Sequence, residues 1–433
     1  MSLGGSIRRL GFAVKDSLFT AKDFRILPHL RDIRRIQSAD AERGMAMARA
    51  HLRACLDAAA ADTEFYAGFA GKSLEDFPVM NKLSINANRA KLASRAYPDP
   101  SRLHTVSTSG STGTPFAVPQ NPEKRARVIA ELKYWNECVG CPSHEKVVYY
   151  RVHCHPSRAS MFWTNVRQTA VLDFEPGHVR AFHAAQRDAV GVLAYASMFE
   201  VLLGKWRAMG LVGSKAVRTV VSGAEFLLPR VRKAAQEFWP NARVVSRYSN
   251  MENGVLAQEI SESDAFALCW ASYWFEILKF DSDEPAAPGE TGRLVVTDMF
   301  QRTLPMIRYD TGDAGRIETG PDGWPRLVGL MGRRVDFLYD TKGEVISPYL
   351  TVLLIQDLAA LVQWQVVQEG ARSYRLVLLS TDERATRTAL DGQMPEFRKV
   401  FGEDADFAVE FATEIPSLDS RKRKQFVQKW KTR

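Results

Sequence analysis

The sequence predicts an α/β protein in which a large N-terminal domain is followed by a small α+β domain. Two observations predict this. Between about residues 100 and 330, short runs of β-branched residues alternate with amphipathic stretches, a pattern typical of an α/β core. Beyond residue 332 the rhythm changes to strands separated by single helices. We therefore expect a helical extension of the large domain at 1–75, its main part at 76–332 and the small domain at 333–433.

The elements of the large domain follow from the spacing of apolar residues. Residues 1–75 have helical spacing, as in the stretch 45–56. The β-branched runs predict buried strands at 146–151, 217–221 and 242–246, with helices at 122–137 and 229–238. Residues 289–296 and 326–330 predict strands of an antiparallel sheet or barrel.

The small domain has a different order of elements. The sequence predicts a hairpin at 337–346, a helix at 348–361, strands at 363–369 and 374–380, a helix at 382–401 and a strand at 407–413, followed by a basic tail.

Composition limits the function. The 433 residues are 45% hydrophobic and 25% charged, as in globular proteins. No run of about 18 uncharged apolar residues occurs, which argues against a membrane-spanning helix, and five scattered cysteines suit the cytoplasm. Residues 1–60 and 421–433 are basic while the rest is slightly acidic, so we expect no nucleic-acid partner. The basic ends are either solvated helix faces or a contact with anionic lipids or other phosphates.

The strongest chemical signal is the segment 107–115 (STSGSTGTP), in which eight of nine residues are glycine or carry a hydroxyl or another small side chain. Glycines let the backbone approach an anion closely, while amide N–H groups and hydroxyls supply donors. The segment lacks the spacing of a Walker loop, and no dinucleotide fingerprint occurs in the chain.

Three further segments follow in a matching order, namely 248–252 (YSNME), 308–313 (RYDTGD) and 332–336 (GRRVD) with 342–343 (KG). Together the four segments resemble the signatures of the adenylate-forming enzymes, the superfamily of acyl-CoA synthetases, luciferase and peptide-synthetase adenylation domains. The segments 76–82 (DFPVMNK) and 304–309 (LPMIRY) are similar to those of phenylacetate–CoA ligases and of relatives associated with capsular polysaccharide. Such enzymes carry a mobile small domain.

This resemblance implies a role for each matching residue. The loop Ser109, Gly110, Ser111, Thr112, Gly113 and Thr114 would hold the β- and γ-phosphates of ATP, and Ser222, Gly223, Ala224 and Glu225 would lie beside the adenine. Tyr248 would stack on the base, with Ser249 and Asn250 next to it, and Glu252 would hold Mg²⁺. Asp313 would bind the ribose hydroxyls, Arg333 would support the ribose, and Asp336 would be the hinge.

Lys422 falls where the family carries a catalytic lysine. An ammonium there would stabilise charge that develops between the substrate carboxylate and the α-phosphate. Lys424 is the competing candidate, because Arg421 stands where the family has glycine.

Other positions depart from the family. Asp310 replaces an arginine, and Ser249, Asn250 and Asn253 stand near the acyl pocket. We interpret these as altered specificity, or as loss of activity in a protein that only binds nucleotide. Tyr150 and His155 are candidate pocket residues.

Cysteines and histidines offer one alternative site. Cys138, Cys141, His153, Cys154 and His155 have the residue types of a zinc site, but a predicted strand separates the two groups. The plainer interpretation is a core cysteine pair and a histidine-rich loop.

The resemblance implies an ATP- and Mg²⁺-dependent ligase that converts a carboxylic acid to an acyl-adenylate and passes the acyl group to coenzyme A. An amine or sugar hydroxyl is the alternative acceptor, with a membrane or a glycan precursor as a peripheral partner. A homodimer is compatible with this family.

Overall fold

The computed structural model describes residues 25–108, 116–151, 165–171, 174–260, 265–331, 338–343, 358–415 and 426–430, with short stretches at 7, 10–15, 17–18, 161, 345–346, 351 and 354–355. The chain divides into two compact units. The large unit comprises residues 1–311 and 315–329, and the small unit comprises 312–314 and 330–433.

One mixed sheet dominates the large unit. Its eleven strands among the described residues lie in the order β10-β11-β12-β13-β9-β8-β7-β6-β5-β3-β4. The run from β4 to β7 is parallel, and β8 then begins an antiparallel part. The strands are β3 Val147–Arg151, β4 Val166–Ala170, β5 Gly191–Tyr195, β6 Thr219–Gly223, β7 Arg243–Asn250, β8 Gly254–Glu259, β9 Phe266–Leu268, β10 Tyr273–Leu278, β11 Gly292–Asp298, β12 Tyr309–Thr319 and β13 Pro325–Met331.

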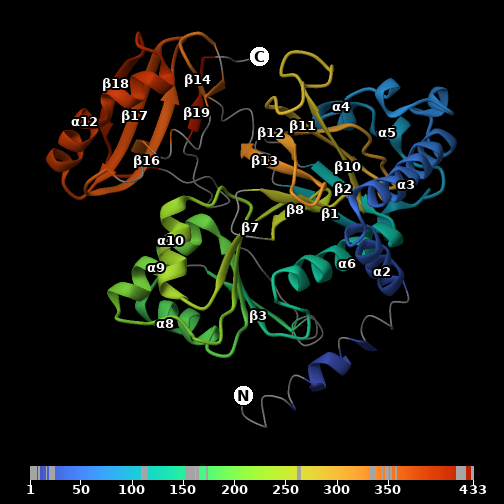
Figure 1. The fold of residues 1–433 in the computed structure, drawn as a ribbon, viewed down its shortest axis with the longest axis horizontal. Helices are drawn as coiled ribbons and strands as arrows, with labels where there is room; N and C mark the ends of the chain where they lie inside the picture. The colour runs from blue at the N-terminus through green and yellow to red at the C-terminus, as the bar shows by residue number, and fades with distance from the viewer. Residues whose placement is uncertain are drawn as a thin grey trace. The chain divides into compact units, whose positions relative to one another are not determined.

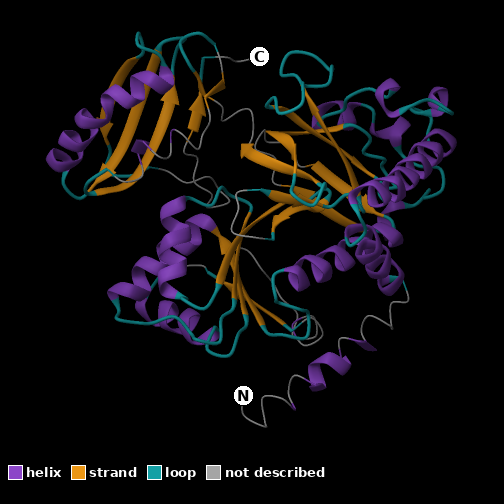
Figure 2. Ribbon diagram, in the orientation of Figure 1, coloured by secondary structure: helices purple, strands orange, loops and turns teal. Residues whose placement is uncertain are grey.

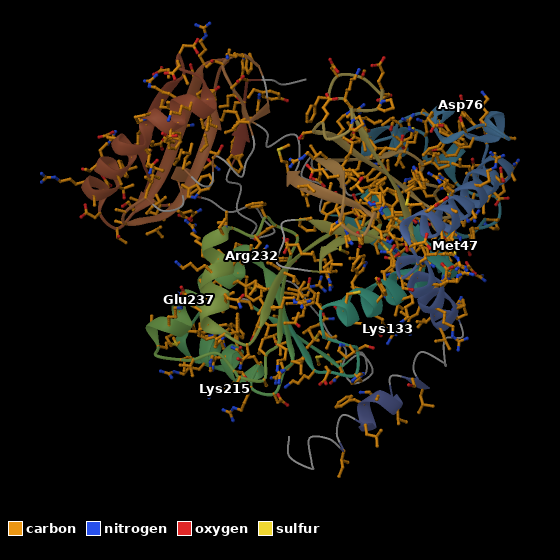
Figure 3. The ribbon with its side chains drawn as sticks, viewed as in Figure 1. Met47, Asp76, Lys133, Lys215, Arg232 and Glu237 are labelled. Carbon is orange, nitrogen blue, oxygen red and sulfur yellow. The ribbon has the colours of Figure 1, made fainter. Side chains whose placement is uncertain are left out.

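Helices cover the parallel strands because each strand is followed by an amphipathic segment. The helices α8 (Pro176–Ala185), α9 (Ala196–Ala208) and α10 (Pro229–Phe238) stack beside β3 and β7 (Figure 1). Proline occupies the first turn of α8 and α10, where no backbone donor is lost. Glu237 of α10, labelled in Figure 3, lies in this helical layer. Its carboxylate forms an ion pair of 2.8 Å with Arg207 of α9.

The N-terminal helices pack together and against the antiparallel part of the sheet (Figure 2). They are α2 Ile26–Gln37, α3 Ala41–Asp62 and α6 Pro122–Cys138, with the short helices α4 Lys82–Ala87 and α5 Arg89–Leu92 and the 3₁₀ turns η1 Ala67–Phe69, η2 Leu74–Asp76 and η3 Pro100–Arg102. Asp40 caps α3, since its carboxylate accepts the backbone N–H of Arg43 at 2.9 Å.

A separate hairpin is formed by β1 (His104–Thr108) and β2 (Phe116–Gln120). Phe116 of this hairpin belongs to a hydrophobic cluster that includes Leu56 of α3, Phe77 and Tyr309. This cluster positions three of the segments that carry the sequence motifs.

The small unit has its own core. The strands β16 Leu361–Gln368, β17 Ser373–Ser380, β18 Asp406–Phe411 and β19 Phe426–Gln428 form a sheet in the order β18-β17-β16-β19, and β14 Leu338–Tyr339 pairs with β15 Val345–Ile346. The helix α12 (Glu383–Phe401) buries Phe397 and Phe401 against Tyr374 and Phe407.

These observations confirm the predicted fold class, a large α/β part with a smaller α+β part. No helix in the described ranges is both long and apolar enough to cross a bilayer.

Candidate active site

The predicted phosphate loop connects the two strands of the β1–β2 hairpin. Thr108 and Phe116 are paired across the hairpin, so residues 109–115 join two neighbouring antiparallel positions. The loop residues Ser109 to Thr114 themselves lie outside the described residues, as do His155, Arg333, Asp336, Arg421, Lys422 and Lys424. Their roles stay predictions.

The Ser222–Glu225 segment lies at the carboxyl end of β6. Ser222 pairs with Ser246 and Gly223 with Arg247, so this segment lies beside the strand that carries Tyr248. In open α/β sheets, ligands bind at the carboxyl ends of the parallel strands. The hydroxyl of Ser222 is buried and has no hydrogen-bond partner among the described residues, which leaves a polar atom for a ligand.

The chain turns sharply after β6. Ala224 has a φ of 65°, in the left-handed region that few non-glycine residues adopt. Glu225 accepts a hydrogen bond of 2.8 Å from the backbone N–H of Ser197, in the first turn of α9. Its carboxylate therefore stabilises the positive end of that helix.

Glu252 lies in the turn that joins β7 to β8, and its side chain is only 4% exposed. The hydroxyl of Tyr309 donates a hydrogen bond of 2.8 Å to Oε1 of this carboxylate. The Nζ atom of Lys82 lies 3.0 Å from the same oxygen. The buried charge is thus paired and hydrogen-bonded, as burial of a carboxylate requires.

The turn around Glu252 is held by asparagine side chains. The backbone N–H of Asn253 donates to Oδ1 of Asn250 at 2.8 Å, and the two side-chain amides contact each other at 3.0 Å. Next in the chain, Gly254 has a φ of 129°, and an added Cβ would meet the hydroxyl of Tyr273 at 2.8 Å. Asn250 and Asn253, two departures from the family pattern, therefore have a structural role here.

A buried polar network of side chains from β10 and α6 contacts the same turn. The Tyr273 hydroxyl lies 2.8 Å from the carbonyl oxygen of Asn253 and 3.0 Å from Oε2 of Glu131, and it accepts a hydrogen bond from Lys124. Lys124 in turn pairs with Asp298 at 2.6 Å, and both side chains are fully buried. Burial raises the pKa of Glu131, and it raises the pKa of Tyr273 well above its usual value.

Tyr309 is positioned by the lead-in segment, residues 76–82. The backbone of the lead-in segment pairs with the start of β12. The N–H of Met80 donates to the carbonyl oxygen of Arg308 at 2.9 Å, and the N–H of Asp310 donates to the carbonyl oxygen of Met80 at 2.7 Å. Arg308, at a φ of 45°, pairs with Glu276 at 3.0 Å and donates to the carbonyl of Phe77.

Asp76 opens this lead-in segment. Its carboxylate, labelled in Figure 3, accepts hydrogen bonds from the backbone N–H and the hydroxyl of Ser73, and these bonds close the η2 turn. These local bonds lower the pKa of Asp76.

Asp310, the replacement for the family arginine, is buried beside an arginine of another strand. Nη1 of Arg293 on β11 lies 3.0 Å from Oδ2 of Asp310, and Arg293 also pairs with Asp283 at 2.5 Å. The changed charge of the motif is therefore neutralised inside the protein. Asp313, the predicted ribose ligand, follows Gly312 on β12.

Tyr150, the candidate pocket residue, lies in the core of the large unit. Its side chain is fully buried between the rings of Phe182 and Trp206, and its hydroxyl donates to the carbonyl of Phe182 at 2.6 Å. The pocket role of Tyr150 stays a prediction.

The cysteine pair has the environment of a core. Cys141 is buried with Val147 and Val190, and both Cys141 and Cys138 are free thiols. Burial raises the pKa of Cys141 to about 12, so its thiol stays protonated. The described residues contain no cluster of three metal-ligating side chains. His153 and Cys154 lie outside the described residues.

Two charged partners of the motif residues, Lys82 and Arg293, are not predicted by the sequence. Lys82 ends the lead-in segment that carries part of the resemblance, but nothing in that segment identifies it as the partner of a carboxylate. Arg293 belongs to none of the motif segments. Their partners come from distant positions, so only the folded chain reveals the pairs.

Comparison with known proteins gives two relatives. The chain is 21% identical to Protein CapK of Staphylococcus aureus over 373 residues, which are 81% of this chain and 79% of CapK. It is 26% identical over 159 residues to phenylacetate–coenzyme A ligase of Pseudomonas putida, a match that spans 36% of each protein. No family model matches the sequence.

Solved structures show the fold. The structure of 2-hydroxyisobutyryl-CoA ligase in the postadenylation state, in complex with R3-HIB-AMP, aligns with a TM-score of 0.73 over 91% of each chain at 19% identity. The anthranilate CoA ligase AuaEII in complex with anthranoyl-AMP aligns with a TM-score of 0.57 over 74% of this chain and 64% of its own, at 14% identity. The chain thus shares its fold with these CoA ligases and is similar in sequence to Protein CapK and to phenylacetate–coenzyme A ligase, the two kinds of protein whose branch the ordered motifs resemble.

Proposed function

We propose that the protein is an ATP-dependent ligase that activates a carboxylic acid as an acyl-adenylate, releases pyrophosphate and transfers the acyl group to coenzyme A. The observation that carries this proposal is the buried Glu252 carboxylate, held by Tyr309 next to the hairpin of the predicted phosphate loop. The relatives that are named as CoA ligases support the choice of acceptor.

The residues present fit Mg²⁺. Glu252 offers a hard carboxylate oxygen, the donor type that Mg²⁺ takes together with substrate phosphates. Phe116, the residue that follows the loop, stacks on Tyr309 with ring centroids 6.4 Å apart, and Tyr309 contacts Glu252. When bound, the cation would neutralise charge on the phosphates.

The protein's own groups would perform the remaining tasks. The orphaned hydroxyl of Ser222 and the ring of Tyr248 would bind the adenine, and Asp313 and Arg333 the ribose. Lys422 would stabilise the negative charge that develops as the carboxylate attacks the α-phosphate. The mixed anhydride with AMP is then a good electrophile, which a free carboxylate is not.

Two alternatives keep the same fold. In one, the acyl-adenylate passes to an amine or a sugar hydroxyl. In the other, the protein binds nucleotide without catalysis, although the internal pairing of Asp310 removes one argument for it. The same proposal includes a homodimer and a cytoplasmic location. The free thiols of the described cysteines suit a reducing compartment such as the cytoplasm.

ATP–pyrophosphate exchange with a panel of aryl, fatty, amino and sugar acids tests the adenylation step. We expect exchange that depends on one class of acid and that collapses in Lys422→Ala but not in Lys424→Ala. AMP release that requires coenzyme A supports the thioester, and release driven by an amine or sugar supports the alternative acceptor. ATP binding with no exchange for any acid contradicts the ligase proposal.

A peripheral membrane contact is supported by the N-terminal segment. The side chains of Ile7, Leu10, Val14 and Leu18 recur at helical spacing and are each more than half exposed. Basic residues flank them in the sequence, and a basic amphipathic helix binds anionic lipid surfaces. We expect co-sedimentation with vesicles of anionic phosphatidylglycerol, weaker binding to neutral phosphatidylcholine, and loss of both in Leu10→Glu/Val14→Glu.

A further inference from the structure

The contact between Lys82 and Glu252 has a feature that an ordinary surface ion pair lacks. The Glu252 side chain is 4% exposed while that of Lys82 is 34% exposed. The ammonium therefore faces a buried carboxylate on one side and solvent on the other. Both Lys82 and Tyr309 contact the same oxygen of the carboxylate, Oε1.

Lys82 also lies where the predicted phosphate loop returns to its hairpin. Its Nζ atom is 5.7 Å from the ring centroid of Phe116, the first residue after the loop. The backbone of Lys82 is fixed, because Asn81 caps α4 by accepting the N–H groups of Leu83 and Ser84. Its four-carbon stem can still rotate, as lysine stems do.

The ion pair is not needed to hold the lead-in segment in place. Two backbone hydrogen bonds join Met80 to β12, and the Arg308 guanidinium binds the carbonyl of Phe77. Within α4, Leu83 is exposed, whereas Ile85 is buried in the core. The helix is therefore anchored through Ile85. The cation at this position thus serves the buried Glu252 carboxylate, which it neutralises, rather than the packing of the lead-in segment.

We propose that Lys82 is a nucleotide-binding residue that exchanges partners when ATP binds. In the nucleotide-free protein it neutralises Glu252, and when the carboxylate serves the cation of ATP, the ammonium turns to the β- and γ-phosphates. Charge-assisted hydrogen bonds to phosphate replace the lost ion pair. This inference rests on the proposed function, because it requires Glu252 to serve that cation.

The test compares the binding of ATP and AMP in the presence of Mg²⁺ by titration calorimetry. In Lys82→Met we expect ATP affinity to fall about 10- to 100-fold, the range for loss of a hydrogen bond to a charged group. AMP lacks the β- and γ-phosphates, so its affinity should change less than about twofold. Lys82→Arg keeps the charge and should retain most of the ATP affinity.

Lys91→Met is the matched control, since Lys91 lies on the adjacent helix α5 and forms a long, exposed pair of 3.8 Å with Glu64. It should bind both nucleotides like the wild type. Lys82→Gln provides a second neutral variant if Lys82→Met unfolds. Unchanged ATP affinity, or equal losses for ATP and AMP, in a folded neutral variant overturns the inference alone. A wild-type protein that binds neither nucleotide overturns the proposed function as well.

Discussion

At the scale of single residues, the Glu252 carboxylate has two polar partners, Tyr309 and Lys82, whose exposure to solvent differs. Tyr309 is fully buried, whereas Lys82 reaches solvent. Loss of the negative charge therefore leaves no stranded buried cation, because the lysine can hydrate. The hydroxyl of Tyr309 can still donate to an amide oxygen. We therefore expect a substitution of Glu252 to affect activity much more than stability.

The first prediction tests this expectation. We expect Glu252→Gln to change the free energy of unfolding by less than about 2 kcal/mol. Its ATP–pyrophosphate exchange should fall by about 100-fold or more, because a carboxylate ligand for the cation is lost. Chemical denaturation and isotope exchange measure the two effects, with the exposed Glu284→Gln as control. A variant that keeps full exchange would remove Glu252 from the site.

The second prediction concerns Asp310. Restoring the residue of the family motif, Asp310→Arg, would place two guanidinium groups together at the buried position that Arg293 already occupies. We expect a loss of about 3 kcal/mol or more in unfolding free energy, the cost of an uncompensated buried charge.

The double variant Asp310→Arg/Arg293→Asp supplies the control. It exchanges the two charges, so we expect it to recover part of the lost stability in the same denaturation experiment. If the double variant recovers none of the lost unfolding free energy, side-chain size rather than charge determines stability at this position.

At the scale of elements, the β7–β8 turn shows what the sequence can and cannot predict. The predicted strands at 217–221, 242–246 and 374–380 are confirmed as β6, β7 and β17, because a run of β-branched residues is a local signal. The conformation of the Glu252 turn is not local. It depends on Tyr273 and Lys124, which reach it from β10 and α6, and no pattern within residues 248–254 encodes those contacts.

The candidate site divides in the same way. The motifs predict Ser222 and Tyr248 as adenine-binding residues, a role that stays a prediction, and the strand register places their segments side by side. The burial of the Tyr150 side chain and its bond to the carbonyl of Phe182 were not predictable, because a tyrosine within a buried strand carries no signal for which face it occupies. Lys82 and Arg293 were missed, since an ion pair between distant segments leaves no periodic trace in a single sequence.

The third prediction tests the turn. An added methyl in Gly254→Ala would meet the Tyr273 hydroxyl and the Glu131 carboxylate, both at less than 3 Å. We expect a loss of about 1–3 kcal/mol in stability, together with weaker ATP–pyrophosphate exchange as Glu252 shifts. Gly289→Ala shares the positive φ but meets open space, so it should cost less and leave exchange intact. Equal effects of the two substitutions would show that the backbone conformation, not the clash, matters.

At the scale of the whole molecule, stability depends on a junction of three helices. Nη1 of Arg127 on α6 lies 2.7 Å from Asp32 of α2, and His51 of α3 contacts the same carboxylate. Burial raises the pKa of Asp32, but the hydrogen bond from His51 and the charge of Arg127 outweigh it and hold that pKa well below its usual range. His29 of α2 faces Arg127 at 3.5 Å, with Glu123 of α6 nearby.

The fourth prediction follows from the His29 imidazole. Burial, and next the charge of Arg127, lower its pKa from 6.5 to about 4. Between these values the unfolded chain binds a proton that the folded protein does not, so stability falls as the pH drops from 6.5 towards 4. We expect a loss of about 1–3 kcal/mol in urea denaturation across this window.

Two variants check the assignment of this pH dependence. His29→Gln should flatten the profile between these pH values, while the exposed His178→Gln should leave it unchanged. The loss below this window that Asp32 contributes should persist in both. An unaltered slope in His29→Gln would assign the dependence to other groups.

The fifth prediction concerns the two units of the chain. If the small unit closes differently for adenylation and for thioester formation, the predicted hinge at Asp336 must change its backbone angles. Asp336→Pro fixes φ, so we expect one half-reaction to survive and the other to slow severely. Single-turnover measurements of pyrophosphate release and of thioester formation separate the two, with Asp336→Ala as control. Both steps at normal rates would remove the hinge from the mechanism.

The register of the β1–β2 hairpin has a consequence for how the protein acquires its activity during refolding. Thr108 and Phe116 are near neighbours in the chain, and hairpins of this kind close within microseconds. Lys82 and Tyr309 reach Glu252 from far apart in the sequence, and such distant contacts form slowly because of the chain entropy they cost. Nucleotide binding should therefore return later than most of the secondary structure.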